Sequence, residues 1–180
     1  DRDSSVSVVW DGGSQTVTVR SSKLNLTAKV GQLYLVANGR YLYIPEGVQL
    51  VNDRVTVPLS VLTEAFDASL TWNAATGVVA VTRGSGALTP ADQYYNQDDL
   101  FWLCRIIYAE SGNQPLEGMM AVGNVVLNRV NDPIYPNTIV GVLAQKNQFT
   151  TYQSGKLAYR TPNENSVIAA KLVLDGGVVE

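Results

Sequence analysis

The chain has 180 residues, of which 46% are hydrophobic and 16% charged, and it carries a net charge of −3. This length suits one large domain or two small ones with apolar cores. Because acidic residues outnumber basic ones, the charge does not favour binding to nucleic acid. No apolar run approaches the roughly 20 residues that cross a bilayer. No signal peptide is visible at the N-terminus, so we expect that any export leader has already been removed.

Histidine is absent and there is a single cysteine, Cys104. Zinc sites therefore lose their commonest ligand, and serine and cysteine hydrolases lose their usual general base. In a hydrolase-like enzyme, carboxylates must then transfer the protons, and we expect no metal and no cofactor. Cys104 lies in an apolar helical run, which favours packing over a nucleophilic role that would need a base beside the thiol.

Residues 1–83 alternate apolar and polar positions, as in "VSVVWDGGSQTVTVR" and "GVVAVTR". This pattern predicts half-buried strands joined by turns rich in glycine and asparagine. One segment breaks the alternation: in "VPLSVLTEAFDAS", Pro58 is suited to open a short helix. A repeat is also present, because "SVVWDGGSQTVTVR" from Ser7 and "SLTWNAATGVVAVTR" from Ser69 share a tryptophan, a turn and an alternating strand.

The stretch "NDRVTVPLSVLTEAFDASLTWNAATGVVAVT" resembles the copper amine oxidase N-terminal-like domain, a β-rich module that is repeated in exported bacterial proteins. The resemblance covers about residues 1–83. It does not imply copper here, because no imidazole is available as a ligand. A spacer or wall-associating role is the expectation, with a packed accessory domain as the alternative.

Residues 84–97, "GSGALTPADQYYNQ", are predicted to be a linker. After it, apolar spacing indicates a helix capped by Asp98 or Asp99 and reaching about Glu110. Pro115 is suited to open a second helix to about Asn131. A third is predicted in "PNTIVGVLAQ", and a fourth is predicted to be capped near Asn163 and stopped by the Gly176–Gly177 pair. The expected fold class is α+β, with a mostly α domain at 98–180.

Glu110 follows the apolar run "RIIYA" and stands at the predicted end of a helix. A glutamate there is ordinarily solvated and inert. However, partial burial and the negative end of the helix dipole would both favour its protonated form, as a general acid requires. The residues alone make Glu110 a candidate acid.

The segment "RIIYAESGNQPLEGMMAVGNVVLNRVNDPIYPNTIVGVLAQKNQFT" resembles the cell wall hydrolase family that includes the spore-cortex-lytic enzymes SleB and CwlJ. The elements "YAE", "EGMMAVGNVVLNRV", "PNTIVGVL" and "QFT" carry the resemblance, which covers about residues 98–175. It implies a lysozyme-like α fold, cleavage of peptidoglycan glycan strands, and Glu110 as the catalytic glutamate. Ser111 departs from the family's usual "AEARGE" and is expected to alter the local hydrogen bonds.

A single acid suits a lytic transglycosylase, because ordinary glycosidases use two carboxylates. In that reaction Glu110 protonates the glycosidic oxygen between N-acetylmuramic acid and N-acetylglucosamine, and a 1,6-anhydro sugar forms without water. Two alternatives stay open: a muramidase that uses water through the same glutamate, and a non-catalytic module that only binds the cell wall. Metal-dependent amidase and thiol peptidase activities are disfavoured by the missing histidines.

Further residues are candidates for contact with substrate, and they come from the predicted helix after Pro115 and from "NQFT" and its surroundings: Glu117, Asn124, Asn128, Gln148, Phe149, Thr150 and Tyr152. Glu117 also suits the first turn of a helix. Asn124 and Asn128 fall on one helical face, where they either satisfy buried backbone groups or reach sugar hydroxyl and N-acetyl groups. Phe149 equally suits a core.

The expected partner is peptidoglycan, with no nucleic acid and no insertion into a membrane. Its location would be outside the cytoplasmic membrane, at the wall or the spore cortex. In the family pattern we expect an aromatic-rich segment after the last helix, whereas this sequence ends at "LVLDGGVVE". Either the chain is truncated, in which case we expect the substrate cleft to lack one wall, or further sequence supplies that segment.

Overall fold

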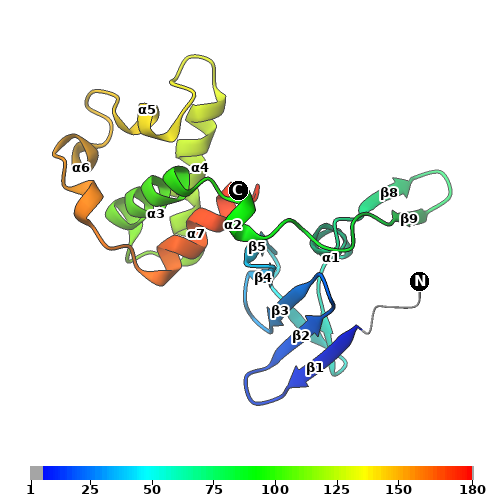
Figure 1. Cartoon of the computed structure of the whole chain (residues 1–180). Coiled ribbons are helices and arrows are strands. Elements are labelled where there is room, and N and C mark those ends of the chain that lie inside the picture. The colour runs from blue at the N-terminus through cyan, green and yellow to red at the C-terminus, as the bar shows by residue number, and fades with distance from the viewer. Residues whose placement is uncertain (1–5, 180) are drawn as a thin grey trace. The chain divides into compact units, whose positions relative to one another are not determined.

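The computed structural model describes residues 6–179 and divides the chain into two compact units, Asp1–Tyr94 and Tyr95–Glu180. Figure 1 shows mostly strands, with short helical segments, in the first unit and helices throughout the second. The predicted α+β class, with a β-rich part followed by a mostly α part, is confirmed. Within the described residues, each helix is too short or too polar to cross a membrane.

The first unit is built on a five-stranded antiparallel sheet in which each strand pairs with its neighbour in sequence. Its strands are β1 (Ser7–Asp11), β2 (Thr16–Arg20), β3 (Asn25–Lys29), β4 (Tyr34–Ala37) and β5 (Arg40–Tyr43). Alternate residues of β3, β4 and β5 are buried, as the period of two predicts. Their core also contains Ile44, Val48 and Ala65, and Val17 and Val19 of β2 pack against it.

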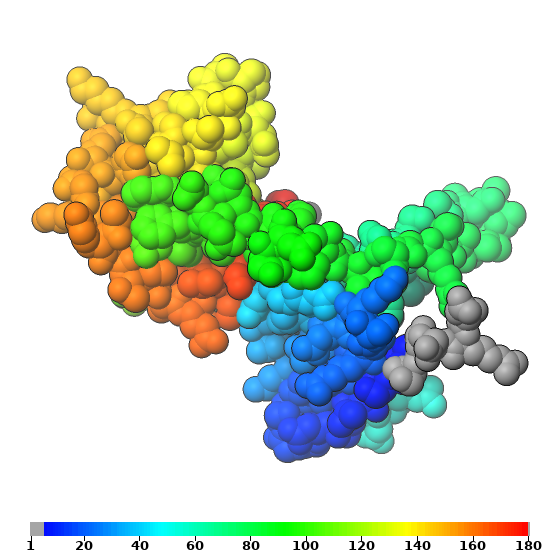
Figure 2. All heavy atoms as spheres, in the orientation of Figure 1, coloured from blue at the N-terminus to red at the C-terminus, as the bar shows by residue number. Residues whose placement is uncertain are grey.

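The two tryptophan repeats form hairpins with the same register. Trp10 pairs with Val17 in β1–β2, and Trp72 pairs with Val79 in β8 (Ser69–Asn73) and β9 (Val78–Thr82). The prediction that these strands are half-buried is wrong for β1, β8 and β9, in which every residue is exposed. Figure 2 shows β8–β9 projecting from its own unit, which explains the exposure, since no further strand covers it within residues 6–179.

Between the sheet and the second hairpin lie a short hairpin and the predicted helix. The hairpin joins β6 (Gln49–Val51) to β7 (Arg54–Thr56) through Asn52 and Asp53, which both have positive φ as a two-residue turn of this kind requires. The helix α1 (Leu59–Ala65) begins directly after Pro58, as predicted. Pro58 suits this position because the first turn of a helix has no use for its missing N–H.

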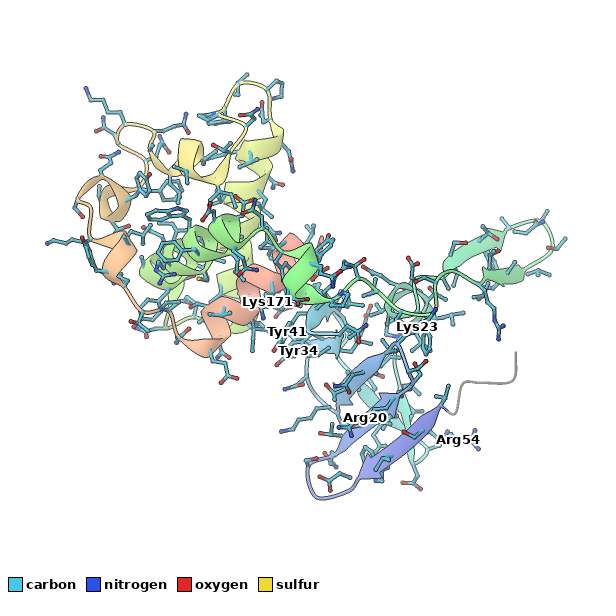
Figure 3. The ribbon with its side chains drawn as sticks, viewed as in Figure 1. Arg20, Lys23, Tyr34, Tyr41, Arg54 and Lys171 are labelled. Atoms are coloured by element: carbon cyan, nitrogen blue, oxygen red, sulfur yellow. The ribbon has the colours of Figure 1, made fainter. Side chains whose placement is uncertain are left out.

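Residues 84–94, part of the predicted linker, belong to the first unit. Leu88 is buried in the core of that unit, and its N–H donates to the carbonyl of Ala65 at 3.1 Å. The ammonium of Lys23, labelled in Figure 3, donates to the Ser85 carbonyl at 3.0 Å. A short helix, α2 (Ala91–Tyr94), ends this segment. The apolar Leu88 explains the difference, because burying it fixes a segment that glycine and serine would leave free.

The second unit packs three long helices against one another. They are α3 (Gln97–Ser111), α4 (Leu116–Asn131) and α7 (Glu164–Leu174). The start of α4 after Pro115 and the cap of α7 at Asn163 are confirmed. The third predicted helix is the short α5 (Ile139–Leu143), and the structure adds α6 (Thr150–Gln153) and the 3-10 helix η1 (Leu157–Tyr159).

Gly123 of α4 lies where side chains of both α3 and α7 approach the α4 backbone closely. A Cβ at this position would lie 2.8 Å from Cγ2 of Val173 in α7 and 3.1 Å from Cδ1 of Ile107 in α3. The C-terminal end of α7 is held from the other side, because the Tyr95 hydroxyl donates to Asp175. The ammonium of Lys171, labelled in Figure 3, also lies 5.8 Å from the centre of the Tyr95 ring. These contacts pack α3, which carries Glu110 near its end, against α4 and α7.

Candidate functional site

Glu110 is the second-last residue of α3. The helix begins at Asn96, whose side chain accepts from the N–H groups of Asp98 and Asp99. The prediction that one of these aspartates is the cap is therefore wrong: both lie in the first turn, where their charge suits the helix dipole. The helix ends at Gly112, where a Cβ would lie 2.6 Å from the Tyr108 carbonyl oxygen. Glu110 is thus followed by one more helical residue and by Gly112, whose N–H still donates to the Tyr108 carbonyl at 3.0 Å.

The side chain of Glu110 is exposed, so the expected partial burial is wrong. It lines an open pocket of about 300 Å³ at the end of α3. The lining residues are mostly polar: Tyr108, Ala109, Glu110, Ser111, Gly112, Asn113, Gln114 and Arg160. These residues carry one carboxylate, one guanidinium, two amides and one phenol, a set that suits a hydrated, hydrogen-bonding ligand such as a sugar better than an apolar one.

Three hydrogen bonds hold the backbone of this pocket. The Ser111 hydroxyl donates to the Ile107 carbonyl at 2.8 Å, and the Gln114 N–H donates to the Ser111 carbonyl at 2.8 Å. The Asn163 side-chain amide donates to the Gly112 carbonyl at 3.0 Å, which ties the loop to the start of α7. Ser111 is buried and its hydroxyl points back into the helix, so the residue that departs from the family pattern supports the backbone beside Glu110.

Arg160, Asn113 and Gln114 line the pocket without having been predicted as site residues, and Arg160 is the one that lies far from Glu110 in sequence. It is exposed and follows η1, fifty residues after Glu110 in the chain. Within residues 6–179, neither its side chain nor that of Glu110 has a hydrogen bond or an ion pair. No local motif marks Arg160, so only the folding of the second unit brings it to the acid.

Glu117 and Asn124 lie outside this pocket. Glu117 is exposed in the first turn of α4. This is the helix position that its sequence context also suited. Asn124 is buried; its amide donates to the Gly177 carbonyl at 2.8 Å, and its side-chain oxygen accepts from the Val179 N–H at 3.2 Å. Asn124 therefore satisfies buried backbone groups, one of the two roles that the sequence left open, and its amide is not available to a sugar.

Asn128 is exposed, so it does not share the environment of Asn124 although both lie on α4. The predicted "NQFT" contacts form a separate group around Arg129. One guanidinium nitrogen of Arg129 donates to the side-chain oxygen of Gln148 at 3.0 Å, and the guanidinium lies 5.7 Å from the centre of the Phe149 ring. Phe149 is buried, as expected if it packs in the core, whereas Gln148 and Thr150 are exposed.

Tyr152 packs edge-on against Trp102 of α3, with ring centres 5.3 Å apart, and Trp102 also contacts Phe101 at 5.0 Å. None of Gln148, Phe149, Thr150 and Tyr152 lines the pocket at Glu110. The structure therefore does not join these residues to the Glu110 pocket, and their role as sugar contacts stays a prediction.

Cys104 is buried in α3, and its thiol donates to the Phe101 carbonyl at 3.4 Å. Burial raises the pKa of the Cys104 thiol, against the opposing charge of Arg105. A raised pKa disfavours the thiolate that a nucleophile needs, so Cys104 serves packing. Within residues 6–179 no three Cys, Asp or Glu side chains gather into a group that could hold a metal ion.

Comparison with known proteins assigns both parts of the chain. Residues 113–180 match the family model described as Cell Wall Hydrolase, and residues 3–81 match the one described as Copper amine oxidase N-terminal domain. The chain therefore contains a cell wall hydrolase domain in its C-terminal part. The match to that family model begins three residues after Glu110, so it does not itself include the candidate acid.

Relatives of the cell wall hydrolase domain carry more specific names. A spore cortex-lytic enzyme of Bacillus cereus is 41% identical over 81 residues, which are 45% of this chain and 30% of the relative. One from Bacillus subtilis (strain 168) is 36% identical over 81 residues, 45% of this chain and 25% of the relative. The chain thus spans less than a third of the length of these two relatives.

Among solved structures, the catalytic domain of the germination-specific lytic transglycosylase SleB from Bacillus anthracis is 36% identical to this chain. The alignment covers 50% of this chain and 70% of that one, with a TM-score of 0.42.

Proposed function

We propose that the cell wall hydrolase domain cleaves the glycan strand of peptidoglycan and that Glu110 is its acid. The observation that carries this proposal is the pocket at the end of α3, in which Glu110 is the single carboxylate among polar side chains. The names of the relatives, spore cortex-lytic enzymes and a lytic transglycosylase, support the same substrate class. Cortex or wall peptidoglycan lies outside the cytoplasmic membrane, so we propose that location for the protein.

A single carboxylate favours a transglycosylase over a two-carboxylate glycosidase. Glu110 gives its proton to the glycosidic oxygen as the bond from that oxygen to C1 of N-acetylmuramic acid breaks. The Glu110 carboxylate then takes the proton of the C6 hydroxyl while that oxygen bonds to C1. The products are a 1,6-anhydro end and a free hydroxyl on the leaving sugar, and Glu110 is again protonated, so no water is consumed and all protons balance.

Exposure of Glu110 fits this reaction because the acid has to reach an oxygen in the middle of a polymer. A polymer can lie along a site only if that site is open to solvent, as the pocket at Glu110 is. The bound glycan itself would then exclude water from the acid, which strengthens the electrostatic interactions during proton transfer. General acid catalysis of this kind contributes about 10²- to 10⁴-fold to a rate.

The test is to incubate purified peptidoglycan with the chain, with Glu110→Gln and with Glu117→Gln, and to identify the released fragments by mass. Glu110→Gln should release fragments at least about 10²-fold more slowly than wild type, whereas Glu117→Gln should retain activity because Glu117 lies outside the pocket. Anhydro ends identify the transglycosylase. Reducing ends would instead identify a muramidase with the same acid, and binding without any release would identify a wall-binding module.

A further inference from the structure

Two hydrogen bonds, one from the Arg160 backbone and one from Asn163, hold the segment that contains Arg160 at the Glu110 pocket. It ends η1, where its N–H donates to the Leu157 carbonyl at 3.1 Å. Three residues later, the Asn163 amide donates to the Gly112 carbonyl at 3.0 Å. The segment 160–163 is thus fixed to the loop that follows Glu110, and the guanidinium lines the same space as the acid.

The guanidinium of Arg160 has no hydrogen-bond acceptor within residues 6–179, whereas those of the other two arginines of the second unit each have one. Arg105 lies over the Phe101 ring at 3.5 Å and donates to the Phe101 carbonyl at 3.0 Å. Arg129 donates to Gln148. The guanidinium of Arg160 has no acceptor within residues 6–179, and Glu110, the one acid that lines its pocket, does not pair with it.

We propose that Arg160 binds a carboxylate on the peptide side chain of the glycan substrate, next to the bond that Glu110 cleaves. The inference rests on the proposed function and names the substrate class of the same site: glycan strands whose muramic acid carries an acidic peptide. A guanidinium matches a carboxylate with two parallel N–H···O bonds, which favours it over a neutral ligand. The amides of Asn113 and Gln114 line the same pocket and suit the peptide and N-acetyl groups of such a strand.

This contact is made before and during the reaction, so it acts mainly on binding. An interaction that is equal in the ground state and the transition state changes KM and leaves kcat almost unaltered. Hydrogen bonds to charged groups correspond to changes of about 10- to 100-fold in affinity, and an exposed site such as this one falls near the lower value, about 10-fold. Arg160 is thus a specificity-determining residue, and the chemistry remains with Glu110.

The test compares peptidoglycan strands that keep their peptides with strands from which an amidase has removed them. Wild type should show a KM about 10-fold lower for the peptide-bearing strands. Arg160→Gln should lose that difference, with kcat and the rate on peptide-free strands unchanged, and Arg160→Lys should restore part of it. Lys156→Gln is the matched control, because Lys156 is exposed nearby in sequence but does not line the pocket.

Equal effects of Arg160→Gln on both kinds of strand, or a wild type that does not discriminate between them, would overturn the proposal. Sedimentation of the Glu110→Gln chain with each kind of strand gives a second readout that needs no cleavage. In that assay Arg160→Gln, added to Glu110→Gln, should reduce binding to peptide-bearing strands alone. If wild type cleaves neither strand but this binding difference is present, the proposed reaction fails while the role of Arg160 stands.

Discussion

Asn163 joins the start of α7 to the loop behind Glu110, and its replacement should weaken both at once. Its side-chain oxygen accepts from the Ser166 N–H at 2.9 Å and from the Ser166 hydroxyl at 2.6 Å, and these bonds together cap α7. Its amide donates to the Gly112 carbonyl at 3.0 Å. Loss of an N-cap costs about 1 kcal/mol, and loss of a neutral hydrogen bond costs about 1 kcal/mol. Asn163→Ala should therefore lower the free energy of unfolding of the second unit by about 2 kcal/mol.

The matched variant Asn163→Ser separates the two terms. Serine keeps a cap oxygen but cannot reach the Gly112 carbonyl as a donor, so the expected loss is about 1 kcal/mol. Glycan cleavage should still fall in this variant, because the backbone beside Glu110 loses its anchor to α7. The control is Asn165→Ala, which removes an exposed amide with no partner within residues 6–179 and should stay within about 0.5 kcal/mol of wild type.

Thermal melting followed by circular dichroism at a helical wavelength measures these changes, because the long helices all belong to the second unit. For a domain of this size, 1 kcal/mol shifts Tm by about 4–8 °C. Asn163→Ala should thus melt roughly 10 °C below wild type, and Asn163→Ser about half as far below. Equal shifts for the two variants, or no shift for Asn163→Ala, would refute the assignment of two separate bonds.

Three further predictions follow from buried positions. Asn124→Ala should lower the free energy of unfolding, measured in urea, by about 2 kcal/mol, because it leaves the Gly177 carbonyl without its donor. If stability were unchanged and glycan binding were lost, Asn124 would instead be a sugar contact. Gly123→Ala should destabilise by about 1–3 kcal/mol, since the clash with Val173 outweighs a gain of about 1 kcal/mol in helix propensity; a higher melting temperature would contradict this. Because burial raises the pKa of Cys104, its thiol should react with a thiol reagent more slowly in folded than in urea-unfolded chain. The stability that Cys104 adds over Cys104→Ala should be complete below its ordinary pKa of 9.0 and decline as pH rises through the folded-state pKa, and an increase there would show the opposite shift.

The sequence alone determined the elements that depend on local chemistry. Helix α4 runs from Leu116 to Asn131 as expected, because Pro115 suits its start and its apolar residues recur at the helical period. The cap of α7 at Asn163 was equally readable. The tryptophan repeat predicted two like hairpins, and both have the same register. Where several caps compete within three residues, as at Asn96, Asp98 and Asp99, local signals did not select the right one.

The surroundings of Glu110 were decided by tertiary structure. The apolar residues before it suggested partial burial, yet they turn toward α4 and α7 while Glu110 faces solvent. The two side chains that complete its site, Arg160 and Asn163, come from about fifty residues further along the chain. Periodicity and capping rules act over a few residues, whereas such contacts depend on how helices pack and on which loops that packing brings together. For the same reason the exposed hairpin β8–β9 and the packed segment around Leu88 became visible only in the fold.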